Sequence, residues 1–160
     1  MPKAFLIGGK LCCGKTTYAE KLIAEHKAVL LSCDEIMLSL FGGHTGENHD
    51  EEVAKIKQYL LAKSLEIIKA GASVILDWGF WTKAERDFTK VYYRKNGVDF
   101  EFHYIEVSDD VWHNRIQMRN ASVLAGDTGA YFVDENLTAK FEKDFEAPDK
   151  NEIDFFAEKL

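Results

Sequence analysis

The segment Gly9–Thr16 contains the residues of this chain best suited to bind phosphate. It reads Gly9-Lys10-Leu11-Cys12-Cys13-Gly14-Lys15-Thr16 and matches G-x-x-x-x-G-K-[ST] at every fixed position. The glycines let the backbone curl so that successive N–H groups point inward at phosphate oxygens. Lys15 is expected to reach the β- and γ-phosphates, and the Thr16 hydroxyl to ligate Mg²⁺. The segment, together with Thr17, therefore predicts a P-loop that binds ATP or GTP with Mg²⁺.

The elements expected on either side of this motif favour the same interpretation. Ala4–Ile7 is an apolar run that predicts a strand, and Thr16–His26 carries its apolar residues on a single helical face. The positive end of the helix dipole would add to the attraction for phosphate. From average residue frequencies, the pattern would arise by chance in under about 1% of chains of this size. We expect a working phosphate site rather than an unliganded glycine turn.

Cys12 and Cys13 are unusual in the variable part of such a loop. They could be small fillers, or they could make the loop sensitive to oxidation and alkylation, because the positive field of the loop would lower a thiol pKa. Together with Cys33 they form neither a zinc spacing nor a disulfide framework. Reduced thiols in a cytoplasmic protein are the expectation.

Composition predicts one domain covering residues 1–160, with 46% hydrophobic and 29% charged residues. The net charge of −7 disfavours long-range attraction to a nucleic-acid backbone and favours a small acceptor. No apolar run is long enough to span a bilayer, and the N-terminal apolar stretch is too short for a signal peptide. We expect a soluble protein with no membrane partner, and we make no prediction of its oligomeric state.

Strand and helix patterns alternate along the chain, which predicts an α/β fold: a three-layer P-loop sandwich with a mostly parallel five-stranded sheet. Ligands of such a sheet bind at the carboxyl ends of its strands. After Asn120 the periodicity loosens, and Ala121–Tyr131 is expected to be a loop. Further strands are expected at Val29–Leu31, Val74–Asp77, Phe100–Val107 and near Ile153–Phe156; helices are expected at Glu35–Phe41, Asp50–Ala70, Thr82–Lys95, after the N-cap candidate Ser108, and at Asp134–Phe145.

Three further segments extend the P-loop signal: Leu31–Asp34, Val74–Trp81 and Arg115–Arg119. In this order and spacing the chain, from Phe5 to about Pro148, resembles the P-loop kinases of the AAA_33 group. That group is similar to polynucleotide kinase, zeta toxin and chloramphenicol phosphotransferase. The resemblance implies a nucleoside-kinase-like fold with a short lid at about residues 119–132.

The resemblance also assigns roles to two carboxylates. Asp34 follows the second strand, where these kinases carry the group that accepts the proton of the acceptor hydroxyl, although an N-cap role is the structural alternative. Asp77 ends an apolar strand at the usual place of a Walker-B-like carboxylate. It would hold Mg²⁺ through water or orient the acceptor, or else bond the backbone of the following turn. Trp78 would form a wall of the acceptor pocket or belong to the core.

Three arginines are candidates for binding phosphate or acceptor. Arg115 and Arg119 are four residues apart and hence on the same helical face. In the resembling kinases such a pair begins the lid and contacts the transferred phosphate or stacks on adenine; surface arginine is the alternative. Arg86 falls where some members bind acceptor or phosphate, and a solvated helix face explains it nearly as well. His44 and His49 are interpreted as loop polar residues rather than metal ligands.

The function expected from these residues is that of an ATP-dependent phosphotransferase, which moves the γ-phosphate to a hydroxyl of a small polar acceptor. Two alternatives remain open. One is a polynucleotide 5′-hydroxyl kinase, which the acidic balance disfavours. The other is a nucleotide-binding switch with no acceptor. A GTPase is disfavoured because the chain has no Asn-Lys-x-Asp motif.

Overall fold

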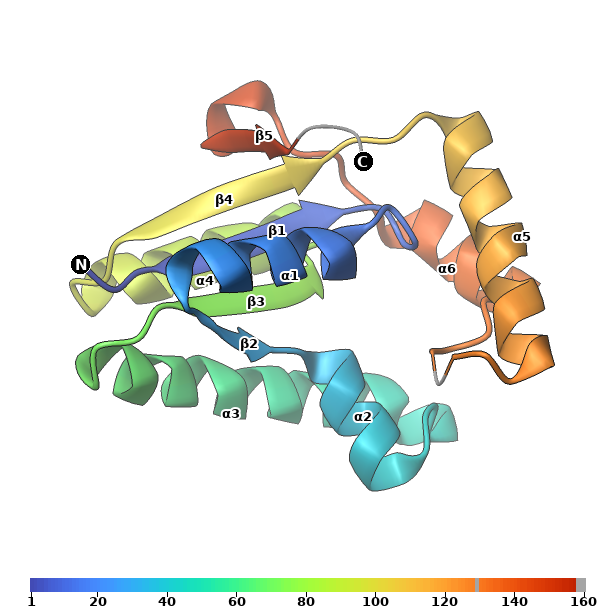
Figure 1. Ribbon diagram of the computed structural model, residues 1–160, viewed down its shortest axis with the longest axis horizontal. Coiled ribbons are helices and arrows are strands. Elements are labelled where there is room, and N and C mark those ends of the chain that lie inside the picture. Colours follow the sequence, from blue (N-terminus) through green and yellow to red (C-terminus); the bar gives the residue numbers. More distant parts are fainter. Residues whose placement is uncertain (129, 158–160) are drawn as a thin grey trace.

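The computed structural model describes residues 1–128 and 130–157; Gly129, inside the predicted lid loop, lies outside the described residues, as do residues 158–160. Five strands form one sheet in the order β2-β3-β1-β4-β5, and all neighbouring strands are parallel (Figure 1). The predicted α/β fold is thus confirmed, with a sheet that is parallel throughout the described residues. The strands are β1 Ala4–Gly9, β2 Val29–Leu31, β3 Val74–Gly79, β4 Phe100–Ile105 and β5 Phe155–Ala157.

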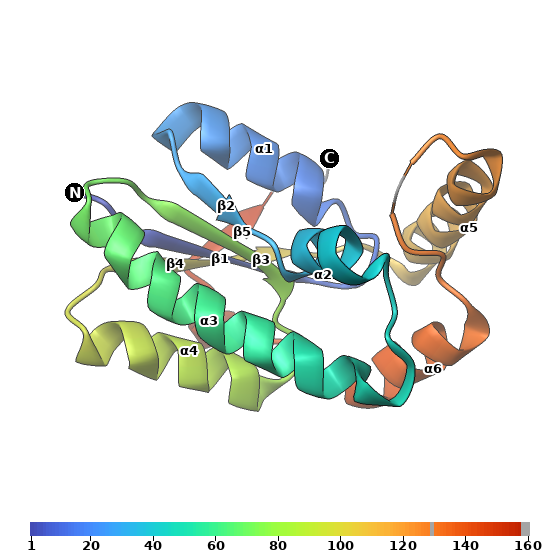
Figure 2. The same ribbon diagram turned by 90° about the horizontal axis from the view of Figure 1, so that it is seen from below.

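Helices cover both faces of this sheet, with α1 on one side and α3 and α4 on the other (Figure 2). The side chains of β1 alternate between the two faces, as the two-residue period of a strand requires. Phe5 and Ile7 belong to the core cluster under α1, whereas Leu6 belongs to the cluster under α3 and α4. The helices are α1 Lys15–His26, α2 Cys33–Phe41, α3 His49–Lys69, α4 Lys83–Lys95, α5 Asp109–Ala125 and α6 Glu135–Asp144, with short 3₁₀ turns at Gly46–Asn48 and Lys150–Glu152.

Local hydrogen bonds set where several helices begin. The predicted N-cap Ser108 accepts a hydrogen bond from the backbone N–H of Val111 at the start of α5. At α2 the cap is Ser32, whose Oγ accepts from the N–H of Glu35 at 3.2 Å. Asp34 lies inside the first turn of α2, so the alternative in which Asp34 caps this helix is wrong.

The predicted lid loop is shorter than expected because α5 continues to Ala125 and ends at Gly126, which has a φ of 77°. The sequence pattern missed this extension because the second half of α5 projects from the core and has no apolar stripe: Leu124 is 78% exposed. Beyond the loop, the chain comes back to α5 at Val133, which is hydrogen-bonded to the Asn120 side chain. The Asn120 Nδ2 donates to the carbonyl of Val133 at 2.7 Å, and its Oδ1 accepts from the Val133 N–H at 2.8 Å.

Helix length and composition also bear on membranes. None of the helices in the described ranges is both long and apolar enough to cross a bilayer. The longest, α3, has 21 residues and carries charged residues along its length.

Candidate functional site

The P-loop backbone takes conformations that require glycine at two positions. Gly9 has a φ of 154° and Gly14 a φ of 102°. A Cβ on Gly9 would lie 2.6 Å from the Cys13 Sγ, and a Cβ on Gly14 would lie 3.1 Å from Nη1 of Arg115. The fixed glycines of the motif therefore permit both the curl of the loop and the close approach of α5.

The two lysines of the loop have different surroundings. The Lys15 ammonium donates to the carbonyl of Lys10 at 2.8 Å and borders the phosphate pocket. The Lys10 ammonium pairs with Asp109 at the start of α5 and lies 5.0 Å from the centroid of the Trp112 ring. Lys10 thus ties the loop to α5, while Lys15 is placed to reach a phosphate.

A pocket of about 450 Å³ opens over the P-loop. Side chains from three separate elements join the loop around this pocket: Asp34 from α2, Asp77 from β3, and Arg115 and Arg119 from α5. These elements meet at the carboxyl ends of the parallel strands (Figure 1), where ligands of such sheets bind. From the loop itself the lining residues are Leu11, Cys12, Cys13, Gly14, Lys15, Thr16 and Thr17.

Asp77 and Thr16 fit a magnesium ion. The Thr16 hydroxyl lies 3.5 Å from Oδ2 of Asp77, and the Asp77 Oδ1 is buried without a hydrogen-bond partner within the described residues. Burial raises the pKa of Asp77, and the Asp34 charge raises it further, while Lys15 and Thr16 lower it. A cation would offset this cost of a buried carboxylate. Mg²⁺ needs few protein ligands, since water and phosphate oxygens complete its shell, so the lack of a three-residue His/Cys/Asp/Glu cluster in the described chain does not exclude it.

The two arginines of α5 both contact the P-loop. The Arg115 Nη1 donates to the carbonyl of Cys13 at 2.5 Å, and the Arg119 Nη1 lies 3.2 Å from the Cys12 Sγ. The Nε of Arg119 is buried and has no hydrogen-bond partner within residues 1–128 and 130–157. Because a buried guanidinium N–H without a partner is costly, Arg119 is suited to receive a phosphate oxygen.

The expectation that the loop lowers the thiol pKa is wrong for Cys13. This side chain is 1% exposed, and burial raises its pKa more strongly than Lys15 lowers it. Cys13 therefore fills space beneath the loop as a neutral thiol. Cys33 is buried as well, and burial raises its pKa to about 11.

Trp78 and Arg86 were both predicted to bind substrate, and neither borders the pocket. The Trp78 Nε1 donates to the carbonyl of Leu31 at 2.8 Å, so only its ring face could contact an acceptor. Arg86 is 1% exposed, and its Nε donates to Oε2 of Glu152 at 2.8 Å.

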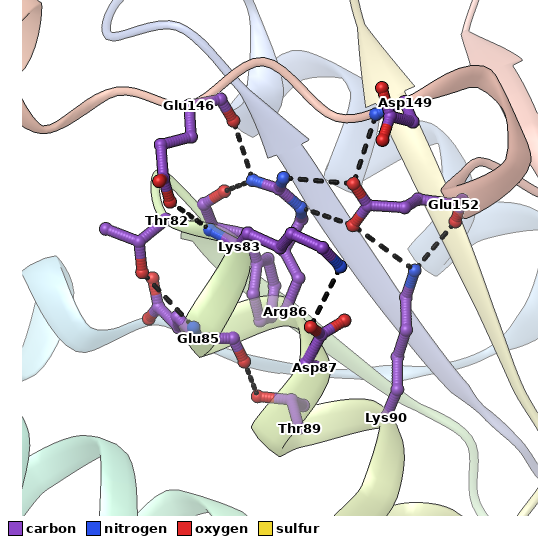
Figure 3. A network of polar contacts seen from close by, with 11 residues as sticks. Thr82, Lys83, Glu85, Arg86, Asp87, Thr89, Lys90, Glu146, Asp149 and Glu152 are labelled. Carbon is purple, nitrogen blue, oxygen red and sulfur yellow. Dashed lines mark hydrogen bonds and ion pairs between the residues drawn. The ribbon is translucent and has the colours of Figure 1, made fainter.

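The structure gives Arg86 a structural role. Its Nη1 donates to the carbonyls of Phe80 and Glu146, and its Nη2 donates to the second oxygen of Glu152 (Figure 3). The guanidinium thus joins α4 to the segment that leads to β5. This structural role replaces the prediction that Arg86 binds acceptor or phosphate.

The sequence did not predict that polar and aromatic residues would cluster around the glycine-rich loop after α2. His49 stacks on His44 with ring centroids 4.0 Å apart, and a Cβ on Gly43 would lie 3.5 Å from the Tyr131 ring. No spacing in the sequence signals this cluster. The glycine-rich loop around residues 42–46 was the one hint of an unusual backbone.

The AAA_33 family, described as an AAA domain, matches residues 5–148. The chain belongs to this family. The match covers the P-loop, Asp34, Asp77 and both arginines of α5, which confirms the recognised family. Among curated proteins, none matches the chain.

Solved structures share the fold at low identity. The APS kinase of Mycobacterium tuberculosis in complex with AMPPNP and APS is 16% identical, with a TM-score of 0.67 over 98% of this chain and 87% of that one. A sugar kinase from Janibacter is 16% identical, with a TM-score of 0.65 over 98% and 85%. A gluconokinase from Sinorhizobium meliloti is 15% identical, with a TM-score of 0.61 over 97% and 81%. These likenesses show a P-loop kinase fold.

Proposed function

We propose that this protein is an ATP-dependent kinase that transfers the γ-phosphate to a hydroxyl of a small polar acceptor in the cytoplasm. The observation that carries the proposal is the convergence of Asp34, Asp77, Arg115 and Arg119 on the P-loop pocket. Membership of the AAA_33 family and the fold shared with small kinases support it. Phosphoryl transfer depends mainly on positioning and on charge neutralisation, which these groups supply.

Each residue has a task in this reaction. The P-loop N–H groups and Lys15 hold the phosphates of ATP. Arg115 and Arg119 stabilise the charge that develops on the transferred group. The exposed Asp34 carboxylate accepts the proton of the attacking hydroxyl, which leaves the acceptor oxygen bonded to phosphorus and ADP as the leaving product.

Thr16 and Asp77 would hold Mg²⁺, with Asp77 acting directly or through water. The ion supplies neutralisation of the β- and γ-phosphate charge when it is bound. The unpartnered Asp77 Oδ1 supports this assignment because a buried carboxylate oxygen is stable only with a donor or a cation beside it.

The test is transfer of γ-labelled phosphate from ATP·Mg²⁺ into a panel of nucleosides, sugars, aminoglycosides, nucleotide-sugars and oligonucleotides. We expect a labelled small-molecule product. Asp34→Asn should lower its rate about 10²- to 10⁴-fold and leave ATP affinity unchanged, because the proton acceptor is lost while the phosphate site is intact.

Two results would redirect the assignment. Label found only in oligonucleotides would instead indicate a polynucleotide kinase. In that case the affinity of the protein for oligonucleotides should fall steeply as the salt concentration rises. Slow hydrolysis that is equal in the wild type and Asp34→Asn, with no labelled acceptor, would indicate a nucleotide-binding switch.

A further inference from the structure

Four buried polar atoms, from the loop after α2, the first turn of α3 and Tyr131, have no hydrogen-bond partner among the described residues: Thr45 Oγ1, His49 Nδ1, Glu52 Oε2 and the Tyr131 hydroxyl. A buried polar group without a partner destabilises a fold, and native structures contain few of them. Four in one region suggest atoms that are kept for a ligand.

These atoms share one corner of the molecule, which we call the acceptor corner: Gly43–Thr45, His49, Glu52 and Tyr131. The Tyr131 ring packs against Gly43, and the His44 ring stacks on His49 with an interplanar angle of 12°. Glu52 is three residues after His49 in α3 and therefore on the same helical face.

The acceptor corner adjoins the nucleotide pocket through Asp34. Burial raises the pKa of Tyr131 to about 12, and the Asp34 charge contributes to this increase. Burial lowers the pKa of His49, and the same Asp34 charge opposes that shift. Asp34 also lines the P-loop pocket, so the same carboxylate connects the corner to the proposed site of phosphoryl transfer.

Two lysines beside the corner are already paired with carboxylates. Lys57 forms an ion pair with Glu85, and Lys140 holds both oxygens of Asp50 at 2.5 and 2.7 Å. Burial lowers the pKa of His49 and so disfavours a positive charge on its ring.

The His44 ring is held within its own loop, where its Nδ1 accepts the Gly46 N–H at 3.0 Å. The remaining cations beside Asp34 are Lys15, Arg115 and Arg119, and the proposed reaction commits them to the phosphates of ATP. An anionic acceptor would therefore face Asp34 and Glu52 without a further compensating charge, which disfavours its binding.

We propose that Thr45, His49, Glu52 and Tyr131 bind the phosphate acceptor, and that this acceptor is a polyhydroxylated molecule that carries no anionic group. The inference rests on the proposed kinase function. Hydroxyl groups both donate and accept hydrogen bonds, so a polyol can satisfy all four atoms. An amine on the acceptor would also be favoured by the carboxylates.

Matched acceptors that differ in charge test this proposal. Label transfer from ATP·Mg²⁺ is compared for glucose, glucosamine and gluconate, for adenosine and APS, and for an aminoglycoside. We expect the neutral and amine-bearing members to be phosphorylated. Efficient transfer to gluconate or APS, with none to the neutral and cationic members, would overturn the acceptor class while leaving the kinase function in place. Transfer to no member, with hydrolysis insensitive to Asp34→Asn, would refute both.

Two matched variants then test the residues. Tyr131→Phe removes an unpartnered hydroxyl, whereas Tyr93→Phe removes a hydroxyl that donates to the Ser64 Oγ at 2.8 Å. We expect Tyr131→Phe to raise the acceptor KM about fivefold, with no loss of Tm and no change in AMPPNP affinity. Tyr93→Phe should lower the Tm and leave the KM unchanged. An unchanged acceptor KM in Tyr131→Phe, Thr45→Val and Glu52→Gln would reject the assignment.

Discussion

Two buried polar regions of this protein differ in how completely their atoms are paired. Around Arg86, the guanidinium contacts Glu152 and two backbone carbonyls, and Lys90 donates to the Glu152 carbonyl at 2.7 Å (Figure 3). In the acceptor corner, by contrast, four buried polar atoms have no partner in the described chain. Paired groups lower the free energy of the fold by themselves, whereas unpaired groups become favourable only when a ligand arrives. Burial alone therefore does not separate structural from functional polar residues.

Arg86→Met should give the largest effect. It removes the Arg86 partner of the Glu152 carboxylate, which is 12% exposed, and loss of one member of a buried pair costs about 3–5 kcal/mol. Urea unfolding would measure this loss. The rate of phosphate transfer per folded molecule should stay near the wild-type value, and a selective fall in kcat with normal stability would return Arg86 to the active site.

Arg119→Ala should show the opposite pattern. Removing one donor to a developing phosphoryl charge costs about 10²- to 10³-fold in kcat. The side chain contributes little to folding because, within the described residues, its Nε has no hydrogen-bond partner and its Nη1 donates to the Cys12 thiol. Steady-state kinetics would measure the loss of kcat, and a thermal melting curve would measure the stability. A large loss of Tm with normal kcat per folded molecule would place Arg119 among the structural arginines.

Acid should weaken the Arg86 region at a defined pH. The Arg86 hydrogen bond lowers the pKa of Glu152 from 4.5 to about 2. The unfolded chain therefore takes up this proton first, and the stabilisation is complete above about pH 4.5 and is lost as pH falls toward 2. Unfolding free energies measured across this range should fall less steeply in Glu152→Gln than in the wild type. Equal slopes would show that other carboxylates set the acid limit.

Thr45→Val should give the smallest effect. The sign of its change in unfolding free energy separates the acceptor corner from the Arg86 region. The Thr45 hydroxyl is buried and has no hydrogen-bond partner within the described residues. Its replacement by a methyl group removes a desolvation cost, so the free energy of unfolding should stay equal or rise by up to about 1 kcal/mol. Calorimetry of the protein without ligand measures it. A clear destabilisation would mean that the hydroxyl has a structural partner after all.

The sequence predicted the parts of this protein whose contacts are local. The P-loop depends on backbone geometry within the segment Gly9–Thr17, so its glycines and Lys15 are recognisable without a structure. The positions of Asp34 and Asp77 beside the P-loop were predictable because each lies near the carboxyl end of a strand, and parallel strands bring these ends together. The order of strands and helices was predictable as well, because hydrophobic periodicity is a local property of the sequence.

Only the tertiary structure showed the role of residues whose partners lie far away in the sequence. Arg86 and Arg119 both looked like candidates for phosphate, yet Glu152, 66 residues away from Arg86, makes that arginine structural. The sequence did not predict that α5 continues to Ala125, because an exposed helix end has no apolar pattern. The acceptor corner joins Gly43 to Tyr131 across the fold. A side chain's role depends on its charge environment and burial, and these arise only when distant segments pack together.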